Sequence, residues 1–238
     1  MVARAGDTLR RLEELGRAIV SCSKCPRLAD YRVRVAGGNP RYRASEYWSR
    51  PLPGFGDPQA RIVIVGLAPA AHGGNRTGRM FTGDESGSTL MRALHEVGLA
   101  SKPYSVSRDD GLTLRGVYIT AALRCPPPGN RPLGSELANC REYLVRELEI
   151  LSGARVYVAL GRIAWASLIR SLKLLGAEVP AEPGFSHGLQ VEARLGGTTR
   201  YLIASYHPSP RNTRTGLLNH GMLVSIFRRA LELSRPPP

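Results

Sequence analysis

The alternation of short apolar runs with amphipathic segments restricts the fold of this chain more than any other feature of its sequence. Ile62-Val63-Ile64-Val65 is a continuous apolar run that ends in a glycine-rich turn, as expected of a buried parallel strand. Further strands are predicted over 117–123, 156–160, 189–195 and 201–205, and helices over 8–20, 86–97, 135–151, 163–175 and 217–233. Alternating strands and helices predict an α/β fold, a three-layer α/β/α sandwich around a central, mostly parallel four-stranded sheet.

Two segments depart from this alternation. The segment 31–57 is rich in proline, glycine, arginine and aromatic residues and has no clean period, so we expect an ordered loop. Gly196-Gly197 separates the last two predicted strands, which should form a hairpin whose second arm is a central strand. The length of 238 residues suits one compact core, and we expect a single domain over 1–238 with an N-terminal arm, 1–57, packed on it.

The charge of the chain indicates a polyanionic partner. Lysine and arginine outnumber aspartate and glutamate by 33 to 19, and the net charge is +14. Such an imbalance favours nucleic-acid binding, although a solubility surface is the alternative. Nearly all the positive charge is arginine, which makes bidentate contacts with phosphate, but codon usage produces the same bias. No apolar run approaches the ~20 residues needed to span a membrane, and charged residues begin almost at once, so we expect a cytoplasmic protein without secretion signal.

Four cysteines indicate a metal site. Cys22 and Cys25 form a C-x2-C pair, and Cys125 and Cys140 form a looser second pair. In a reducing compartment disulfides are disfavoured, so four thiols with one close pair predict a four-cysteine metal site. Proline after Cys25 and after Cys125 favours an iron–sulfur cluster over zinc. Four buried free thiols are the alternative, and a structural role for the metal is preferred to redox sensing.

Three unusual segments follow predicted strands, where α/β sheets bind their ligands. They cover residues 66–83, 125–131 and 207–212. Glycines in the first allow backbone amides to approach a ligand closely, although its pattern is neither a Walker loop nor a dinucleotide fingerprint. Because parallel strands end at one edge of a sheet, we expect the three segments to converge on one site.

The motifs in these segments are G-L-A-P-A at 66–70, N-R-T-G-R at 75–79, F-T-G-D at 81–84, R-C-P-P-P-G-N at 124–130 and H-P-S-P-R-N at 207–212. In this order and spacing they resemble family 5, the type B enzymes, of the uracil-DNA glycosylase superfamily, over essentially the whole chain. The resemblance implies hydrolysis of the N-glycosidic bond of uracil and other deaminated bases in DNA by base flipping, for base excision repair. It also implies a 4Fe-4S cluster on the four cysteines, with zinc as the less favoured occupant. A monomer is expected, and a sliding clamp is a further partner to consider.

The resemblance assigns roles to particular residues. Phe81 would stack on the flipped base, Asn130 would read its uracil-like edge, and His207 would donate a hydrogen bond to the oxygen of the leaving base. Asp84 would act on the sugar side as general base or electrostatic partner. The alternatives are structural, since Phe81 and His207 could belong to the core, Asp84 could only cap a helix and Asn130 could only shape a turn.

The base pocket departs from better-known branches of the superfamily at two positions. Gly66, Ala68 and Ala70 are expected to line the pocket. Alanine replaces the water-handling residue at position 68 and the bulky residue that excludes the thymine methyl at position 70. The first change makes Asp84 an inferred base, and the second predicts a roomier pocket that accepts hydroxymethyluracil, hypoxanthine or mismatched thymine.

The third motif is expected to contact DNA. Pro208 and Ser209 would pinch the phosphates, and Arg211 would enter the duplex in place of the flipped base. Asn212 would touch the abasic sugar or cap the last helix. A nuclease or a non-catalytic iron–sulfur nucleic-acid-binding protein is the competing interpretation, but a nuclease needs clustered carboxylates, and near these loops only Asp84 and Glu85 qualify.

Overall fold

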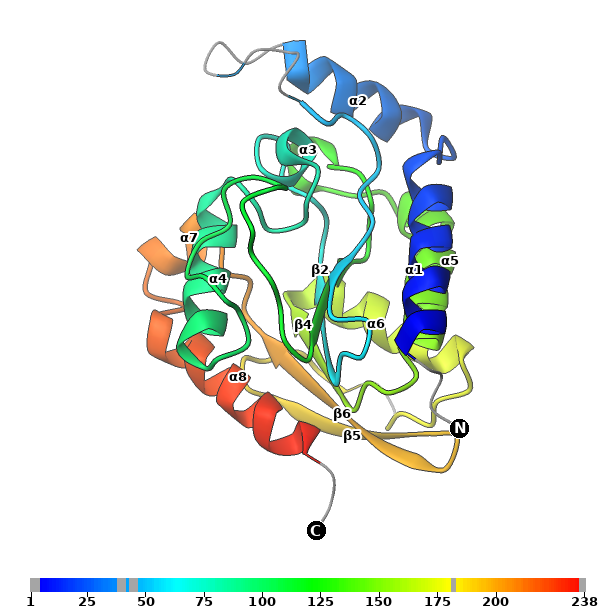
Figure 1. The fold of residues 1–238 in the computed structure, drawn as a ribbon, viewed down its shortest axis with the longest axis vertical. Helices are drawn as coiled ribbons and strands as arrows, with labels where there is room; N and C mark the ends of the chain where they lie inside the picture. Colours follow the sequence, from blue (N-terminus) through cyan, green and yellow to red (C-terminus); the bar gives the residue numbers. More distant parts are fainter. Residues whose placement is uncertain (1–4, 38–41, 43–46, 181–182, 236–238) are drawn as a thin grey trace.

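A computed structural model of the chain describes residues 5–37, 42, 47–180 and 183–235 (Figure 1). Its helices are α1 (Ala5–Val20), α2 (Pro26–Gly37), α3 (Gly74–Thr77), α4 (Glu85–Glu96), α5 (Gly134–Ile150), α6 (Arg162–Leu174), α7 (Pro210–Arg214) and α8 (His220–Ser234). Its strands are β1 (Phe55–Gly56), β2 (Ile62–Gly66), β3 (Val117–Ala121), β4 (Val156–Leu160), β5 (Gln190–Leu195) and β6 (Thr198–Ser205). None of the described helices is long and apolar enough to cross a membrane.

One mixed sheet organises the fold, in the order β1-β3-β2-β4-β6-β5. The central strands β3, β2, β4 and β6 run parallel, which confirms the predicted four-stranded parallel core. Two antiparallel strands extend it: β5 forms the predicted hairpin with β6, and β1 pairs with β3 at the other edge. The sequence did not predict β1 because two residues are too few to show a period.

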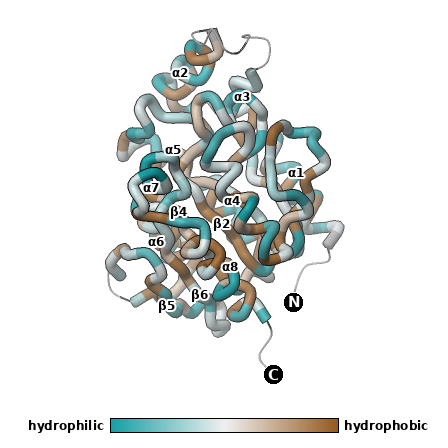
Figure 2. The backbone as a smooth tube through the Cα atoms, turned by 90° about the vertical axis from the view of Figure 1, so that its left-hand side faces the viewer, coloured by the Kyte–Doolittle hydropathy of each residue, from teal (hydrophilic) through white to brown (hydrophobic). Residues whose placement is uncertain are grey.

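Helices cover both faces of the sheet. Successive residues of a strand point to opposite faces, so Ile62 and Ile64 of β2 pack in a core with α4 and α8, while Val63 and Val65 pack in a core with α5 and α6. Helix α1 lies along α5 on the outside of the second layer, as Figure 1 shows. Figure 2 shows hydrophobic residues concentrated in the central strands and hydrophilic residues along the outer loops.

The prediction of a loop over 31–57 is wrong for the first residues of that segment, because α2 continues to Gly37. Pro26 occupies the first helical position, where its missing N–H costs nothing, and Leu28 and Ala36 are buried on one face of the helix. Arginines interrupt the apolar spacing of this segment, which hides its period. The last helix also differs from expectation, because Asn219, and not Asn212, caps α8 by accepting the Met222 N–H at 2.9 Å.

Candidate active site

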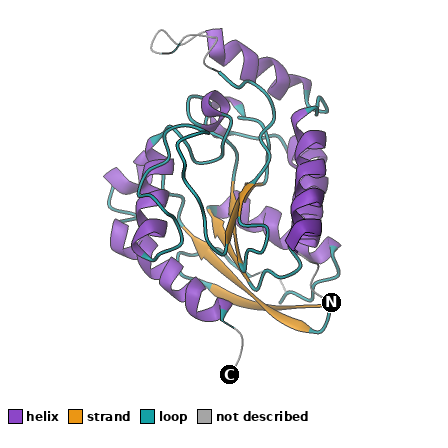
Figure 3. Cartoon of the chain, viewed as in Figure 1, coloured by secondary structure: helices purple, strands orange, loops and turns teal. Residues whose placement is uncertain are grey.

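The three motif segments leave the sheet at the same edge. Strands β2, β3 and β6 are members of the parallel core, so their carboxyl ends lie at one edge of the sheet, with β4 between β2 and β6. The first two loops stay paired beyond the strands, because the Ala122 and Leu123 amides donate to the Gly66 and Leu67 carbonyls at 2.9 Å. Figure 3 shows long loops beyond the ends of the central strands. The three motif segments therefore start from one edge of the sheet, as predicted.

Phe81 and His207 meet at this edge, although they come from the first and third motif loops. Their rings are stacked with centroids 5.9 Å apart and planes inclined by 29°. Glycine is required beneath Phe81, since a Cβ on Gly66 would lie 2.9 Å from the Phe81 ring. Gly161, directly after β4, has a φ of 102° that favours glycine, and a Cβ there would make only an ordinary contact of 3.6 Å with the Cβ of His207. Two aromatic faces from distant segments thus share one wall of the site.

His207 is held as a neutral imidazole. Burial lowers the pKa of His207 to about 4, because the charged ring would lose its hydration. Its backbone is fixed by Asn212, whose Nδ2 donates to the His207 carbonyl oxygen at 2.9 Å. Ser209 caps α7 by accepting the Asn212 N–H. At neutral pH the ring therefore carries one N–H that can donate and one nitrogen that can accept.

Asp84 caps helix α4, which is the structural role that the sequence offered for it as an alternative to catalysis. Its Oδ1 accepts the Gly87 N–H at 2.8 Å at the start of α4. Burial raises the pKa of Asp84, and the backbone donors Gly87 and Ser86 and the charge of Arg76 oppose that rise. The other oxygen, Oδ2, lies against Gly73, where a Cβ would overlap it. Capping occupies one oxygen, and burial leaves a carboxylate of raised pKa at the start of α4, three residues after Phe81.

Asn130 and the two alanines lie on the loops that follow β3 and β2. Asn130 is exposed at the end of a 3-10 helix, Pro128–Asn130, in a left-handed conformation with φ of 57°. No hydrogen bond or ring contact among the described residues joins its side chain to Phe81 or His207. Ala68 is partly buried against Leu28, Leu123 and Cys125, and Ala70 is also partly buried.

The residues of the third motif differ in accessibility. Arg211 is exposed on α7, Pro208 is buried, and Ser209 and Asn212 are partly buried. Arg211 can therefore reach a ligand outside the protein, whereas Ser209 and Asn212 hold the loop in shape.

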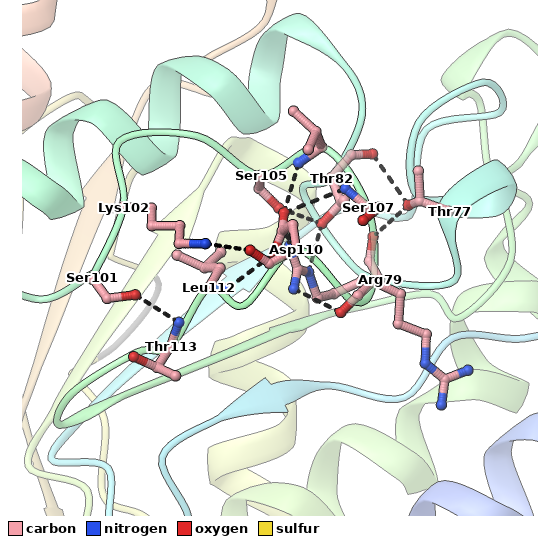
Figure 4. Close-up of polar contacts among 12 residues, drawn as sticks. Thr77, Arg79, Thr82, Ser101, Lys102, Ser105, Ser107, Asp110, Leu112 and Thr113 are labelled. Carbon is pink, nitrogen blue, oxygen red and sulfur yellow. Dashed lines mark hydrogen bonds and ion pairs between the residues drawn. The ribbon is translucent and has the colours of Figure 1, made fainter.

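A buried ion pair that no motif indicated fixes the first loop (Figure 4). Arg79 donates to Asp110 at 2.7 Å, to Ser105 at 2.8 Å and to Thr82 at 3.0 Å. Burial by itself would raise the pKa of Asp110, but the Arg79 guanidinium and three backbone N–H donors lower it to about 2. This network ties the motif residues to the loop 101–113, which is more than twenty residues away in sequence.

A second buried ion pair anchors the loop after β3. Arg124 donates to Glu147 of α5 at 2.5 Å, and both side chains are 1% exposed. The same guanidinium donates to Thr120 at 2.6 Å, and Glu147 also accepts the Gly54 N–H at 3.2 Å. The turn that carries Cys125 and Asn130 therefore starts from a fixed point in the core.

The four cysteines come together as the resemblance implied. Cys22 and Cys25 follow α1, Cys125 follows β3, Cys140 lies on α5, and all four line one cavity of about 20 Å³. Arg32 donates to the Cys125 sulfur at 3.2 Å, and the Arg124 N–H donates to the Cys140 sulfur at 3.3 Å.

Burial favours the protonated form of two of these thiols. It raises the pKa of Cys125 to about 11 and the pKa of Cys140 to about 12. Within the described ranges, no three cysteine, histidine or acidic side chains have the placement that a single metal ion requires. The donor set is nevertheless all sulfur, with N–H groups directed at three of the sulfurs, those of Cys25, Cys125 and Cys140, as suits thiolates that bind a charged group.

The fold and the site together indicate an α/β enzyme whose ligand binds at the carboxyl ends of the parallel strands. A parallel sheet covered on both faces, with polar loops gathered at the carboxyl ends of its strands, is the arrangement in which α/β proteins bind and transform ligands. At that edge this chain has a neutral histidine stacked on an aromatic ring and a carboxylate of raised pKa.

Comparison with known proteins identifies the family. The family model of the uracil DNA glycosylase superfamily matches residues 53–230, so the chain belongs to this superfamily. It is 52% identical to a type-5 uracil-DNA glycosylase of Pyrobaculum aerophilum over 89% of this chain and 88% of that protein. It is 48% identical to a type-5 uracil-DNA glycosylase of Thermus thermophilus over 93% of this chain and 98% of that protein. A type-4 uracil-DNA glycosylase of Archaeoglobus fulgidus is more distant, with 31% identity over 84% of this chain and 83% of that protein.

Proposed function

We propose that this protein is a DNA glycosylase that hydrolyses the N-glycosidic bond of uracil in DNA, as the first step of base excision repair. The observation that carries the proposal is the stack of Phe81 and neutral His207 at the carboxyl edge of the sheet. An aromatic face beside a hydrogen-bond donor is what an extruded nucleobase requires. The names of the type-5 relatives and the net charge of +14 support the same conclusion.

The chemistry follows from the charges that develop. As the C1′–N1 bond breaks, the electron pair leaves with the base, so the base oxygen gains negative charge and the sugar gains positive charge. The N–H of His207 donates to that oxygen, and because the ring is neutral it stabilises the anion as a hydrogen-bond donor that keeps its proton and not as a cation. Asp84 orients the water that attacks C1′ and stabilises the cationic sugar, and the proton released by the water passes to Asp84 or to solvent. Asn130 pairs with the polar edge of the base.

We infer a broad base specificity from the small side chains of Ala68 and Ala70. Neither contributes atoms beyond Cβ, so neither rejects a methyl group or a larger ring by steric overlap. Hypoxanthine, hydroxymethyluracil and mismatched thymine are therefore proposed as further substrates. On the DNA side, Arg211 on the exposed surface of α7 would occupy the space left by the extruded base, and Ser209 would contact the phosphates, whereas the buried Pro208 would only stiffen the loop.

We also infer that Cys22, Cys25, Cys125 and Cys140 hold a 4Fe-4S cluster. A single zinc ion binds sulfur at about 2.3 Å and so needs thiolates closer together than a cluster of four irons does. Four thiols that line one cavity, with a proline directly after Cys25 and after Cys125, support the cluster. Such a cluster would join α1, α5 and the loop after β3, and it would take no part in the hydrolytic step. A brown protein with about four irons per chain would support this assignment, and zinc without iron would overturn it.

An incision assay tests the proposed activity. Labelled duplexes with uracil, hypoxanthine, hydroxymethyluracil or mismatched thymine are incubated with the protein and then treated with alkali, which cleaves abasic sites. We expect cleavage of the uracil strand, and a loss of at least ~10²-fold in rate for His207→Ala, the size of the effect of removing one oxyanion donor. Asp84→Ala and Asn130→Ala should also lose activity. A wild-type protein that leaves every duplex intact would refute the function, and cleavage of uracil alone would refute only the broad specificity.

A further inference from the structure

A large cavity of the described structure lies outside the candidate active site. It is a groove of about 1020 Å³ between α1 and the segment 48–58, and the groove extends to the loop that contains Arg108. Figure 1 shows the segment 48–58 running beside α1. Phe81, Asp84 and His207 do not line the groove. Small-molecule sites usually measure ~300–1000 Å³, so this groove has room for a segment of a polypeptide.

One end of the groove concentrates positive charge without a counter-charge. Arg50 and Arg108 both lie over the indole ring of Trp48, with guanidinium carbons 5.9 Å and 4.9 Å from its centroid. In the described part of the chain neither arginine forms a salt bridge, and Glu13 is the only acidic side chain that lines the groove. Like charges held close together repel, and an anion between them would remove that repulsion.

The arginine pair is also held in place. Trp48 packs flat against Gly78, where a Cβ would lie 3.1 Å from the indole, and the Arg108 carbonyl accepts a hydrogen bond from Arg79 at 3.1 Å. Guanidinium groups fixed in this way lose less side-chain entropy when they bind an anion. Gly78 packs against the Trp48 ring, and both guanidinium groups lie over it.

The rest of the groove is mixed: polar and charged side chains line it at Glu13, Arg17, Ser21, Arg32 and Arg79, and apolar side chains lie between them. Helix α1 contributes Leu9, which is 47% exposed, together with Leu12 and Val20, and the opposite wall includes Pro53. The walls approach each other at Gly16, where a Cβ would lie 3.6 Å from the Cβ of Pro53. A DNA backbone presents mainly charged phosphates and offers little apolar surface to these side chains. A peptide that carries both carboxylates and apolar side chains matches both halves of the groove.

We propose that this groove is a docking site for an acidic peptide segment of a partner protein, with its carboxylates on Arg50 and Arg108 and its apolar side chains against α1. This inference does not depend on the glycosylase activity. It adds to the protein a contact surface that recruits another protein while the carboxyl edge of the sheet stays open to DNA.

Fluorescence anisotropy tests the proposal with three labelled probes. The first is a short peptide of alternating acidic and leucine or phenylalanine residues, the second has serine in place of every apolar residue, and the third is a uracil-free oligonucleotide. Arg50→Glu/Arg108→Glu reverses the charge of the pair, and Leu9→Ser removes an exposed apolar contact at little cost to folding. Arg170→Glu/Arg194→Glu is the matched control, because it changes two exposed arginines elsewhere and alters the net charge equally.

We expect the first peptide to bind the wild type. Its affinity for the Arg50→Glu/Arg108→Glu variant should be ~10²-fold lower, since like charges at an interface cost several kcal/mol. Leu9→Ser should weaken it several-fold, and the serine peptide should bind less tightly than the first. Equal weakening by the control variant, a serine peptide that binds as tightly, or no binding to the wild type would overturn the proposal. Selective loss of the oligonucleotide in the Arg50/Arg108 variant would show a DNA surface instead. Unchanged thermal midpoints establish that all variants are folded, and all should keep their activity on uracil-containing duplexes.

Discussion

Gly73→Ala should inactivate the enzyme through Asp84. A Cβ at position 73 would overlap Oδ2 of Asp84 and lie 2.7 Å from its Cγ. Restoring the 3.4 Å of an ordinary contact moves Cγ by about 0.7 Å and moves Oδ2 further. Displacement of a positioned group by about 1 Å costs ~10²-fold in rate. We therefore expect kcat on a uracil-containing duplex to fall by ~10²-fold.

The displacement should cost less in stability than in rate. Asp84 caps α4 through its other oxygen, and loss of such a cap costs ~1 kcal/mol. Gly134→Ala is the matched control, because a Cβ there meets nothing within 4 Å and the residue lies in the first turn of α5. This variant should keep the wild-type rate.

A double-mutant cycle separates this mechanism from a general disturbance of the loop. In an Asp84→Ala background Gly73→Ala has no carboxylate to displace, so we expect it to cause little further loss of single-turnover rate. A full ~10²-fold loss in that background would refute the reasoning. Wild-type activity of Asp84→Ala would remove Asp84 from the mechanism altogether.

Other predictions follow from single contacts and pKa shifts. Asp110→Asn leaves the Arg79 guanidinium buried without its partner and should lower the free energy of unfolding by ~3–5 kcal/mol in urea titrations, whereas Asn at the exposed neighbour Asp109 should have almost no effect. The imidazole of His207 should titrate near pH 4 by NMR. Its contribution to the free energy of unfolding is therefore present above about pH 6.5, the ordinary histidine pKa, and is lost as the pH falls toward 4. A measured pKa near 6.5 would contradict the role of His207 as a neutral donor. Because burial raises the pKa of Asp84, the acidic limb of the kcat profile should lie above the ordinary aspartate pKa and vanish in Asp84→Asn. Gly66→Ala should displace Phe81 and raise KM for the damaged duplex, and an unchanged KM would show that Phe81 does not form the base platform.

Much of the fold could be predicted because local sequence reports local burial. The apolar run at β2 is buried at all five positions, and Asp84 begins α4 as its cap, as a short acidic side chain before a helical segment indicates. The short strand β1 and the arginine-rich helix α2 were missed, since the first is too short for a period and charged residues interrupt the second.

By itself the sequence determined the parallel α/β sheet, the edge at which the motif loops start and the four thiols that could share a site, because apolar periods, capping residues and motif order are local properties. The stack of Phe81 on His207, the notch that Gly73 provides for Asp84 and the ion pair of Arg79 with Asp110 were decided only by the tertiary structure. The members of two of these pairs lie tens of residues or more apart, and Gly73 and Asp84 meet only through the path of one loop. Such contacts depend on strand order, register and loop path, which no local pattern encodes.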